Sequence, residues 1–460
     1  MKDLVILGST GSIGVQALEI VEANPSLFRV VAITAAGSNT ELLISQAKKF
    51  KVPVVGVTKN ADQIKAALPN ATIIDGPLAS TEIAAITCDV VLNGITGSIG
   101  LGPTLAALRV GNRVALANKE SLVAGGDLVM SLAKPDQLLP VDSEHSALWQ
   151  SLMGGKKSEV SKLILTASGG PFRDRTDLST ITVAEALNHP TWSMGPVVTI
   201  NSATLVNKGL EIIEAHYLFA IAYSQIEAVI HPQSVVHSMV EYVDGSTIAQ
   251  ASPPNMKGPI SFAINYPDRV KAATAPIDWA QSHTWTFAPI DNERFPAIDL
   301  ARRCGALGGG LPAIFNAANE VCVASFIAGK IGFTSIPLQG SAMPTIAPEY
   351  SYKVLIPWRE KLDGSGTSFD YAGFTAAQQE KSIGIGHDGM WYFGDNKKGI
   401  LCINHEYGTT PHLMGKTVPT SAADVALSQT AHGVSVVAIE NVGGKWKVAK
   451  NKKNRRIHVN

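Results

Sequence analysis

The first part of the chain alternates short apolar runs with longer stretches of helical periodicity. Residues 4–7 form an apolar run that predicts a buried strand, a glycine-rich segment occupies residues 8–14, and a helical pattern continues to about Ala23. A second apolar run at residues 29–34 predicts another strand. This order of strand, glycine turn, helix and strand is typical of one half of a dinucleotide-binding fold, and it predicts an α/β architecture with a parallel sheet.

The glycine segment places Gly8, Gly11 and Gly14 in GxxGxxG spacing. Glycine lets the backbone turn tightly and approach a pyrophosphate, which binds at the N-terminus of the following helix. A nearly identical string at residues 94–100 follows the apolar run at residues 89–92. It is either a second phosphate loop or a strand-to-helix turn at the same edge of the sheet. We favour the turn, because one dinucleotide needs one pyrophosphate site.

The end of the second predicted strand bears on the choice of cofactor. NAD sites usually carry an acidic residue about 20 residues past the glycines, where it binds the ribose hydroxyls. Residues 34–39 of this chain contain no acid, whereas Ser38 and Asn39 can donate hydrogen bonds to a 2′-phosphate. We therefore expect NADPH rather than NADH.

Two carboxylates, Asp142 and Glu144, follow the apolar run at residues 138–141. If that run is a strand that continues through them, both side chains point to the same face. Like charges this close raise each other's pKa unless a cation lies between them, and Mg²⁺ and Mn²⁺ favour such oxygen ligands. The alternative is an exposed strand end with two solvated acids.

The segment at residues 201–211 is rich in hydroxyl, amide and ammonium groups that suit a phosphate ester. Asn207 and Glu211 share one face if the segment is helical, and Glu211 is then placed to complete a three-carboxylate metal site with the preceding pair. Lys119 lies two residues after the apolar run at residues 114–117. It faces the ligand crevice of the predicted sheet or, alternatively, pairs with a surface acid.

Three further segments carry candidate residues, each with a structural alternative. Residues 163–170 predict a strand and then a Ser-Gly-Gly turn whose amides suit an anion. Trp192 stands among Pro, Ser and Gly in an apparent loop, which either closes over a substrate or anchors the core. His231 follows the apolar run at residues 228–230, so it is either a histidine at a substrate site or a hydrogen-bonded structural one.

The composition narrows the class of protein further. The 460 residues suffice for two to four domains, and 45% hydrophobic with 17% charged residues is typical of soluble globular proteins. Lys+Arg and Asp+Glu balance at 38 each, which gives no sign of a nucleic-acid partner. Four scattered cysteines indicate neither a zinc knuckle nor a disulfide framework, and no apolar run approaches the ~18–20 residues that span a bilayer. We expect a cytoplasmic protein without a membrane partner.

Several short motifs occur together in one order. They are Gly-Ser-Thr-Gly-Ser-Ile-Gly, Ala-Asn-Lys-Glu-Ser, Pro-Val-Asp-Ser-Glu-His, Ser-Gly-Gly-Pro-Phe, His-Pro-Thr-Trp-Ser-Met-Gly, Asn-Lys-Gly-Leu-Glu, His-Pro-Gln-Ser and Asn-Ala-Ala-Asn-Glu. In these motifs residues 1–336 resemble the 1-deoxy-D-xylulose 5-phosphate reductoisomerases. The resemblance implies isomerisation and reduction of that sugar phosphate to 2-C-methyl-D-erythritol 4-phosphate in non-mevalonate isoprenoid biosynthesis. It also implies NADPH and Mn²⁺ or Mg²⁺ as cofactors, and a homodimer.

The same resemblance implies the roles of individual residues. The catalytic residues would be Lys119 and the three metal-binding acids Asp142, Glu144 and Glu211. The substrate would contact Ser143, Glu144, Ser168, His189, Trp192, Ser202, Asn207, Lys208, Glu211 and His231. NADPH would contact Thr10, Gly11, Ser12, Ile13, Gly37, Ser38, Asn39, Asn118, Lys119, Glu120, Met194 and Gly195. Within these sets, the substrate phosphate would be bound by Ser168, Ser202, Asn207 and Lys208, and a flexible lid would be formed by His189, Trp192 and Met194.

From about residue 337 the pattern changes to short alternating strands with glycine turns. The strings at residues 382–393 and 401–408 resemble the PhoX-type alkaline phosphatases, which are secreted, calcium- and iron-dependent β-propeller enzymes. The resemblance covers only a fragment of that family. We therefore expect an incomplete β-rich segment that is poorly ordered or prone to aggregate, because an unclosed propeller leaves strand edges unpaired.

These observations predict four consecutive parts and leave two rival functions open. The parts are a Rossmann-like NADPH-binding domain (1–145), an α+β catalytic and metal-binding domain (146–290), the start of a truncated helical domain (291–336) and the β-rich PhoX-like fragment (337–460). One rival is an NADPH-binding fusion product that is catalytically impaired because it lacks the C-terminal helices of the family. The other is a phosphomonoesterase that acts through the fragment.

Overall fold

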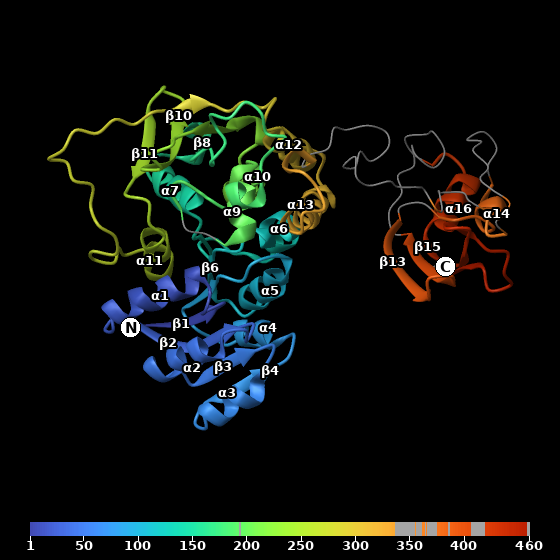
Figure 1. Cartoon of the computed structure of the whole chain (residues 1–460), viewed down its shortest axis with the longest axis horizontal. Coiled ribbons are helices and arrows are strands. Elements are labelled where there is room, and N and C mark those ends of the chain that lie inside the picture. The colour runs from blue at the N-terminus through green and yellow to red at the C-terminus, as the bar shows by residue number, and fades with distance from the viewer. Residues whose placement is uncertain are drawn as a thin grey trace. The chain divides into compact units, whose positions relative to one another are not determined.

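The chain forms two compact units, Met1–Glu349 and Tyr350–Asn460 (Figure 1). The structure is a computed structural model. It describes residues 1–192, 195–335, 355, 361–363, 365, 375–384, 387–405 and 419–457.

A sheet of seven parallel strands forms the N-terminal part of the first unit (Figure 1). Its strands are β1 (Lys2–Leu7), β2 (Phe28–Ala35), β3 (Val54–Val57), β4 (Thr72–Asp75), β5 (Val90–Asn93), β6 (Arg113–Leu116) and β7 (Leu138–Pro140). The strand order is β4-β3-β2-β1-β5-β6-β7, so the chain adds strands on one side of β1 as far as β4 and then continues on the other side with β5. In open α/β sheets ligands bind where the order reverses in this way, outside the carboxyl ends of the strands.

The composition of β1 explains why both faces of this sheet are covered. Leu4 and Ile6 belong to one apolar core, while Val5 and Leu7 belong to another, so alternate side chains fill opposite faces. The covering helices are α1 (Ser12–Ala23), α2 (Thr40–Lys49), α3 (Ala61–Ala67), α4 (Ala79–Ala84), α5 (Leu101–Arg109) and α6 (Glu120–Leu132). The predicted strands, the glycine turn and the helix that follows it are confirmed.

A mixed sheet follows, with strand order β11-β10-β8-β9-β12. Its strands are β8 (Val160–Ala167), β9 (Ile226–Ile230), β10 (Val236–Tyr242), β11 (Thr247–Ala251) and β12 (Ala288–Pro289). The helices of this part are α7 (Ser143–Leu152), α8 (Val183–Ala186), α9 (Pro196–Ala203), α10 (Val206–Phe219), α11 (Lys257–Asn265), α12 (Ala297–Leu307) and α13 (Leu311–Ile327). Helix α10 packs against α6, α7, α9, α12 and α13, so it stands between the two sheets' helical layers.

The prediction of a strand through Asp142 and Glu144 is wrong. Strand β7 ends at Pro140, Asp142 occupies the N-cap position, and Ser143 begins α7. The Asp142 side chain makes no capping hydrogen bond, but negative charge at the N-cap and on Glu144 in the first turn still complements the helix dipole. The acids therefore belong to a helix start, and the strand ends two residues before Asp142.

The described part of the second unit is built on an antiparallel sheet, as the predicted β-rich fold requires. Its elements are α14 (Ala376–Gln379), β13 (His387–Gly394), β14 (Lys398–His405), α16 (Ala422–Ala431), β15 (Gly433–Val442), β16 (Lys445–Val448) and β17 (Arg455–Ile457). The strand order is β13-β14-β15-β16, with β17 also paired to β15. Its core contains Ile383, Ile403, Val437 and Ile439. The expected poor order and aggregation of this segment stay predictions.

Two general features of the described residues bear on the sequence-based expectations. No helix among them is both long and apolar enough to cross a membrane. All four cysteines lie in this part of the chain and are free thiols.

A close contact between α10 and α12 leads to a stability prediction. A Cβ built on Gly209 would lie 2.8 Å from Ala301 Cβ and 3.1 Å from Ala297 O. We expect Gly209→Ala to lower the free energy of unfolding by about 1–3 kcal/mol, because the helices must move apart. Urea denaturation followed by circular dichroism measures this change.

The matched control is Gly258→Ala in α11, where the added Cβ meets only Thr274 Cγ2, at 3.7 Å. This control should be neutral or slightly stabilising, since alanine favours a helix over glycine. Equal effects in the two variants would show that the α10–α12 contact does not limit the side-chain size at position 209.

Candidate active site

A cavity of about 710 Å³ lies between the glycine turn of the first sheet and helices α7, α9 and α10. The predicted site residues on its lining are Gly11, Ser12, Ile13, Lys119, Glu120, Asp142, Ser143, Glu144, Ser168, Trp192, Gly195, Ser202, Asn207, Lys208 and Glu211. Seven other predicted residues are described but lie off this lining: Thr10, Gly37, Ser38, Asn39, Asn118, His189 and His231. Met194 lies outside the described residues.

Three carboxylates meet at one end of the cavity. Asp142 caps α7, Glu144 stands in its first turn, and Glu211 projects from α10. One oxygen atom from each of the three lies within 4.8 Å of the other two. Glu211 is fully buried, so its charge has no contact with water. The expected grouping of these three acids is present, but it is built from two helix N-terminal regions instead of a strand face.

Two ammonium groups hold the carboxylates together. Lys119 Nζ lies 2.7 Å from Asp142 Oδ2 and 3.4 Å from Glu211 Oε1. Lys208 Nζ lies 2.9 Å from Glu144 Oε1 and also pairs with Glu211 Oε2. The two lysines are therefore ion-pair partners within the site, and the surface ion pair considered for Lys119 is absent from these contacts.

The pKa values follow from burial and from these charges. Burial and the neighbouring Glu144 raise the pKa of Glu211 to about 7, against the opposing effect of the two lysines. Burial also opposes ionisation of Asp142, but the adjacent Lys119 ammonium outweighs it and lowers the pKa of that carboxyl. Burial disfavours the charged form of Lys119, yet the surrounding carboxylates raise its pKa well above the usual value.

The donor set fits a hard divalent cation. Carboxylate oxygens are the ligands that Mg²⁺ and Mn²⁺ prefer, and these three converge within the distances that one ion can bridge. Ser143 Oγ donates to Glu144 Oε2 at 2.5 Å and so fixes one of the oxygens. Asn207 binds Lys119 Nζ through Oδ1 at 2.8 Å and Glu211 through its amide nitrogen.

A buried pair behind the carboxylates was not predicted from the sequence. His145 Nε2 lies 2.9 Å from Glu211 O, and its Nδ1 lies 3.5 Å from Glu214 Oε2. Both side chains are essentially inaccessible to water, and burial raises the pKa of Glu214 to about 7. Asp142, His145 and Glu214 form a second group with metal-ligand spacing. The available signal was the (i, i+3) spacing of Asp142 and His145.

A second polar cluster lies where the strand β8 ends. His189 Nε2 lies 3.0 Å from Ser168 Oγ and 3.1 Å from Ser202 Oγ, while its Nδ1 accepts from the amides of Thr191 and Trp192. Because Nδ1 accepts, the neutral ring carries its proton on Nε2 and holds the two hydroxyls together. Burial, with a smaller effect of Arg173, lowers the pKa of His189 and favours this neutral form.

Trp192 and His237 also line the cavity, and sequence analysis did not identify His237. The ring centroids of Trp192 and His237 are 6.4 Å apart. His237 is buried on β10, and Ser252 Oγ lies 3.0 Å from its Nε2. A single histidine in an apolar strand gives no pattern that separates a site residue from a core residue.

His231 has the environment of a structural histidine. It is fully buried, its Nδ1 lies 2.9 Å from Thr286 O, and its Nε2 accepts from the amides of Val235 and Val236. Its ring stacks on Phe287 with centroids 4.6 Å apart. With both nitrogens engaged and no place on the cavity lining, His231 fits the structural alternative better than direct substrate contact.

The glycine turn of the first sheet has the close packing of a phosphate-binding loop. Gly8 has a φ of +78°, and a Cβ on Gly14 would lie 2.4 Å from Ser9 Cα. Helix α1 starts immediately after Gly11, so its free amides face the cavity. Gly94 packs against Gly8, so the two glycine strings lie side by side. The second string is the turn that follows strand β5.

The remaining predicted cofactor residues fall into two groups. Asn118 is buried, and its amide donates to Ile95 O at 2.7 Å and to Gly97 O at 2.8 Å, which braces the second glycine string. Ser38 and Asn39 are exposed at the end of β2, where Asn39 Oδ1 accepts from Leu42 N at 3.1 Å and caps α2. Their remaining donors are accessible to a group bound outside β2.

Family models match nearly the whole chain in consecutive segments. Residues 4–126 match the model described as 1-deoxy-D-xylulose 5-phosphate reductoisomerase. Residues 138–219 match the C-terminal domain of that enzyme, and residues 251–344 match a further C-terminal domain model of DXP reductoisomerase. Residues 331–460 match the model described as alkaline phosphatase PhoX. The two resemblances inferred from motifs are confirmed.

Individual relatives give the same result for the first unit. The 1-deoxy-D-xylulose 5-phosphate reductoisomerase of Kitasatospora griseola is 58% identical over 344 residues, which are 72% of this chain and 89% of that protein. A crystal structure of DOX-P reductoisomerase in complex with NADPH, fosmidomycin and magnesium is 41% identical, with a TM-score of 0.70, over 73% of this chain and 87% of that chain.

The reductoisomerase from Zymomonas mobilis in complex with NADPH is also similar in structure. It is 40% identical with a TM-score of 0.69, and the match covers 73% of this chain and 89% of that chain. On these matches, which span most of each relative's length, the chain belongs to the 1-deoxy-D-xylulose 5-phosphate reductoisomerase family.

Proposed function

We propose that this chain converts 1-deoxy-D-xylulose 5-phosphate to 2-C-methyl-D-erythritol 4-phosphate, using NADPH and a divalent metal ion. The observation that carries the proposal is that one cavity is lined by both the free N-terminus of α1 and the three-carboxylate cluster. A reductase that acts on a chelated sugar needs its cofactor and its cation within one enclosed volume. Relatives solved with NADPH and magnesium support this choice of cofactors.

We assign the activity to residues 1–336, with NADPH bound mainly by residues 1–145 and the substrate by residues 146–290. The pyrophosphate would bind the amides of Ser12 and Ile13 beside Gly11, whose own amide donates to Gly8 O at 3.0 Å. Ser38 and Asn39 would bind the 2′-phosphate, since both are exposed and neither carries a negative charge. Lys119 and Glu120 follow β6 on the same cavity lining, and Gly195 approaches from the start of α9.

The substrate phosphate would bind the cluster around Ser168 and Ser202. Both hydroxyls line the cavity, and His189 holds them 3.0 and 3.1 Å from its Nε2. Asn207 and Lys208, at the start of α10, would add an amide and an ammonium group. Trp192 stands on the same lining, where it would exclude water from the bound sugar.

The metal would be held by Asp142, Glu144 and Glu211, and when bound it supplies Lewis-acid polarisation of the substrate oxygens. Lys119 Nζ, 2.7 Å from Asp142, orients that carboxylate and adds positive charge beside the substrate site. Ser143 would fix Glu144 through its hydroxyl hydrogen bond. His145 and Glu214 would position Glu211 and Asp142 from behind.

A catalytically impaired, NADPH-binding product is the main rival, and one observation favours it. Helix α13 is apolar around most of its circumference, yet Ile314 and Val321 are 61% and 66% exposed. A helix that is hydrophobic all round is normally buried, so this part of the domain presents a face that is suited to further packing.

NADPH oxidation with 1-deoxy-D-xylulose 5-phosphate and Mn²⁺ or Mg²⁺ distinguishes these functions. Turnover supports the reductoisomerase, while tight NADPH binding without turnover supports the impaired product and overturns the proposal. The phosphomonoesterase rests on the PhoX match of residues 331–460. It requires phosphate release from a generic ester in the presence of Ca²⁺, and no release rejects it.

The assembly and location that we propose are a cytoplasmic homodimer with no nucleic-acid or membrane partner. Four free thiols support the cytoplasmic location, and the balanced charge supports the lack of a nucleic-acid partner. The dimer rests on the resemblance to the reductoisomerase family. Light scattering after size-exclusion chromatography tests the dimer: a mass of one chain at micromolar concentration contradicts it.

Replacement of a buried metal ligand should separate metal binding from cofactor binding. Lewis-acid stabilisation is worth several kcal/mol, so we expect Glu211→Gln to lower metal-dependent kcat/KM by at least about 100-fold. The dissociation constant of NADPH, measured by fluorescence quenching, should change little. The control is Glu227→Gln, an exposed acid on β9. Unchanged turnover in Glu211→Gln would remove this residue from the metal site.

A charge at the end of β2 should change cofactor preference. We expect Ser38→Asp to lower the ratio of kcat/KM for NADPH to that for NADH by about tenfold or more, because a carboxylate repels the 2′-phosphate and can accept from ribose hydroxyls. The matched Ser38→Ala variant removes the hydroxyl without adding charge and should have a smaller effect. If neither variant moves the ratio, the 2′-phosphate is recognised elsewhere.

A further inference from the structure

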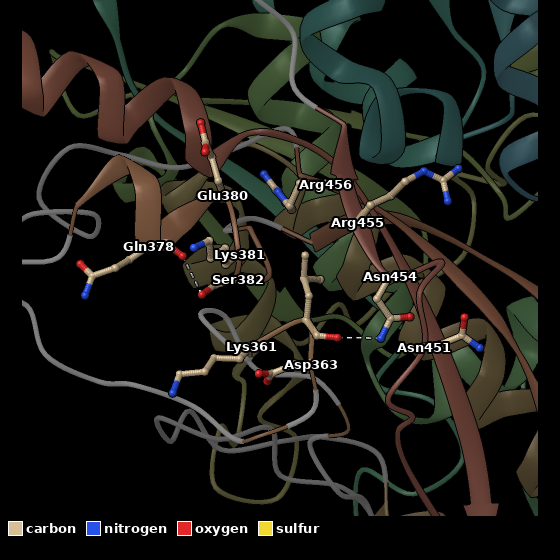
Figure 2. Close-up of a pocket in the computed structure, with 11 residues that line it drawn as sticks. Lys361, Asp363, Gln378, Glu380, Lys381, Ser382, Asn451, Asn454, Arg455 and Arg456 are labelled. Atoms are coloured by element: carbon tan, nitrogen blue, oxygen red, sulfur yellow. Dashed lines mark hydrogen bonds between the residues drawn. The ribbon is translucent and has the colours of Figure 1, made fainter.

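The second unit contains a cavity of about 630 Å³ that none of the proposed reductoisomerase chemistry uses. Figure 2 shows its lining, which comes from the segment around Leu362, the end of α14, the turn before β17 and β17 itself. Asn454 joins the turn before β17 to the segment around Leu362, since its Nδ2 donates to Leu362 O at 2.6 Å, and to β15, since its Oδ1 accepts from Ala438 N at 2.7 Å. The Asn454 side chain thus fixes the backbone at one side of the cavity.

The charges around this cavity do not balance. Lys361, Lys381, Arg455 and Arg456 contribute positive charge, and Asp363 and Glu380 contribute negative charge, so the described residues of the lining have a net charge of +2. None of the four basic side chains pairs with a described carboxylate within 4.0 Å. Asp363 is already engaged, because its Oδ1 accepts from Ser365 N at 2.9 Å.

Arg456 is the most unusual of these residues. Its side chain is only 9% exposed, and its guanidinium donates to three neutral acceptors: Ser435 Oγ at 2.9 Å, Thr430 O at 3.0 Å and His432 O at 2.6 Å. Its Nε is buried without a hydrogen-bond partner. Burial lowers the pKa of Arg456 to about 10, and no carboxylate among the described residues forms an ion pair with it.

A buried cation without an opposite charge is costly, and such groups are normally paired or bound to a counter-ion. The guanidinium is held rigidly by its three acceptors and cannot move out to solvent without losing them. The cavity beside it is the place where a mobile anion can approach, and the lysines at its rim raise the local concentration of anions.

We propose that this cavity binds a small oxyanion, such as phosphate or sulfate, with Arg456 as the buried positive anchor and Lys361 and Lys381 as flanking charges. A dianion would offset the net charge of the lining. Arg456 would act mainly through its fixed positive charge, because its Nη donors are engaged by Ser435, Thr430 and His432, and the lysines would supply the direct contacts. The site lies wholly in the second unit and does not depend on the reductoisomerase proposal.

Hydrogen exchange on the full chain tests this proposal with inorganic phosphate as the probe. We expect phosphate to slow exchange in peptides that cover residues 375–384 and 451–457, by about tenfold when its concentration is ten times the dissociation constant. Sodium chloride at equal ionic strength serves as the reference. Because exchange is resolved by peptide, phosphate that binds the first unit does not affect this reading.

Two matched double variants then separate a site from a general ionic effect. Lys361→Gln/Lys381→Gln removes two exposed charges on the cavity and should weaken phosphate protection about five- to tenfold, since each exposed charge is worth up to about 1 kcal/mol. Lys397→Gln/Lys398→Gln removes the same charge from exposed positions off the cavity and should have no effect. Arg456→Lys keeps the charge but loses the three hydrogen bonds that fix its position, and it should also weaken protection.

Three outcomes overturn the proposal. They are equal slowing by chloride, absence of phosphate protection in the unmodified chain, and equal protection in the two double variants. If Arg456→Lys fails to fold, the lysine pairs still decide the matter, because their side chains are exposed and their replacement leaves the core intact.

Discussion

The first unit depends on a balance of charge at one buried point. Asp142, Glu144 and Glu211 would repel one another if they stood alone, and burial raises the pKa of Glu211. The ammonium groups of Lys119 and Lys208 hold two of these acids directly and contact the third. The ion pairs offset the repulsion that the three acids would otherwise introduce where α7, α10 and the loop after β6 meet.

The sheet topology explains how this charge cluster comes to face the glycine turn. Strand order reverses between β1 and β5, so the carboxyl ends of β1, β5 and β6 open on one crevice. Lys119 directly follows β6, and Gly11 follows the end of β1. The sheet topology thus brings Lys119, which pairs with the carboxylates, and the anion-binding end of α1 to the same cavity.

Sequence analysis located those parts of this arrangement that leave a local pattern. The apolar run at residues 4–7 and the glycines after it specify a buried strand and a tight turn by composition. The secondary structure at Asp142 was mispredicted, because a capping residue and a strand end look alike until the helix that follows is known. His145, Glu214 and His237 act through contacts that join segments far apart in the sequence, so no local spacing identifies their partners. His231 shows the converse, since its motif suggested substrate contact while its partners are backbone groups.

Lys119 also joins two layers of the unit, because it belongs to the nucleotide-binding sheet yet pairs with acids on α7 and α10. Any cation that binds these carboxylates competes with this ammonium for the same oxygens. By thermodynamic linkage, a cation that displaces Lys119 from the acids weakens the contact between the sheet and helices α7 and α10. Loosening of that contact raises the affinity of the acids for the cation by the same factor. The Lys119 ion pairs therefore lower the affinity of the carboxylates for a cation, because the cation must replace an ammonium group that also holds the two layers together.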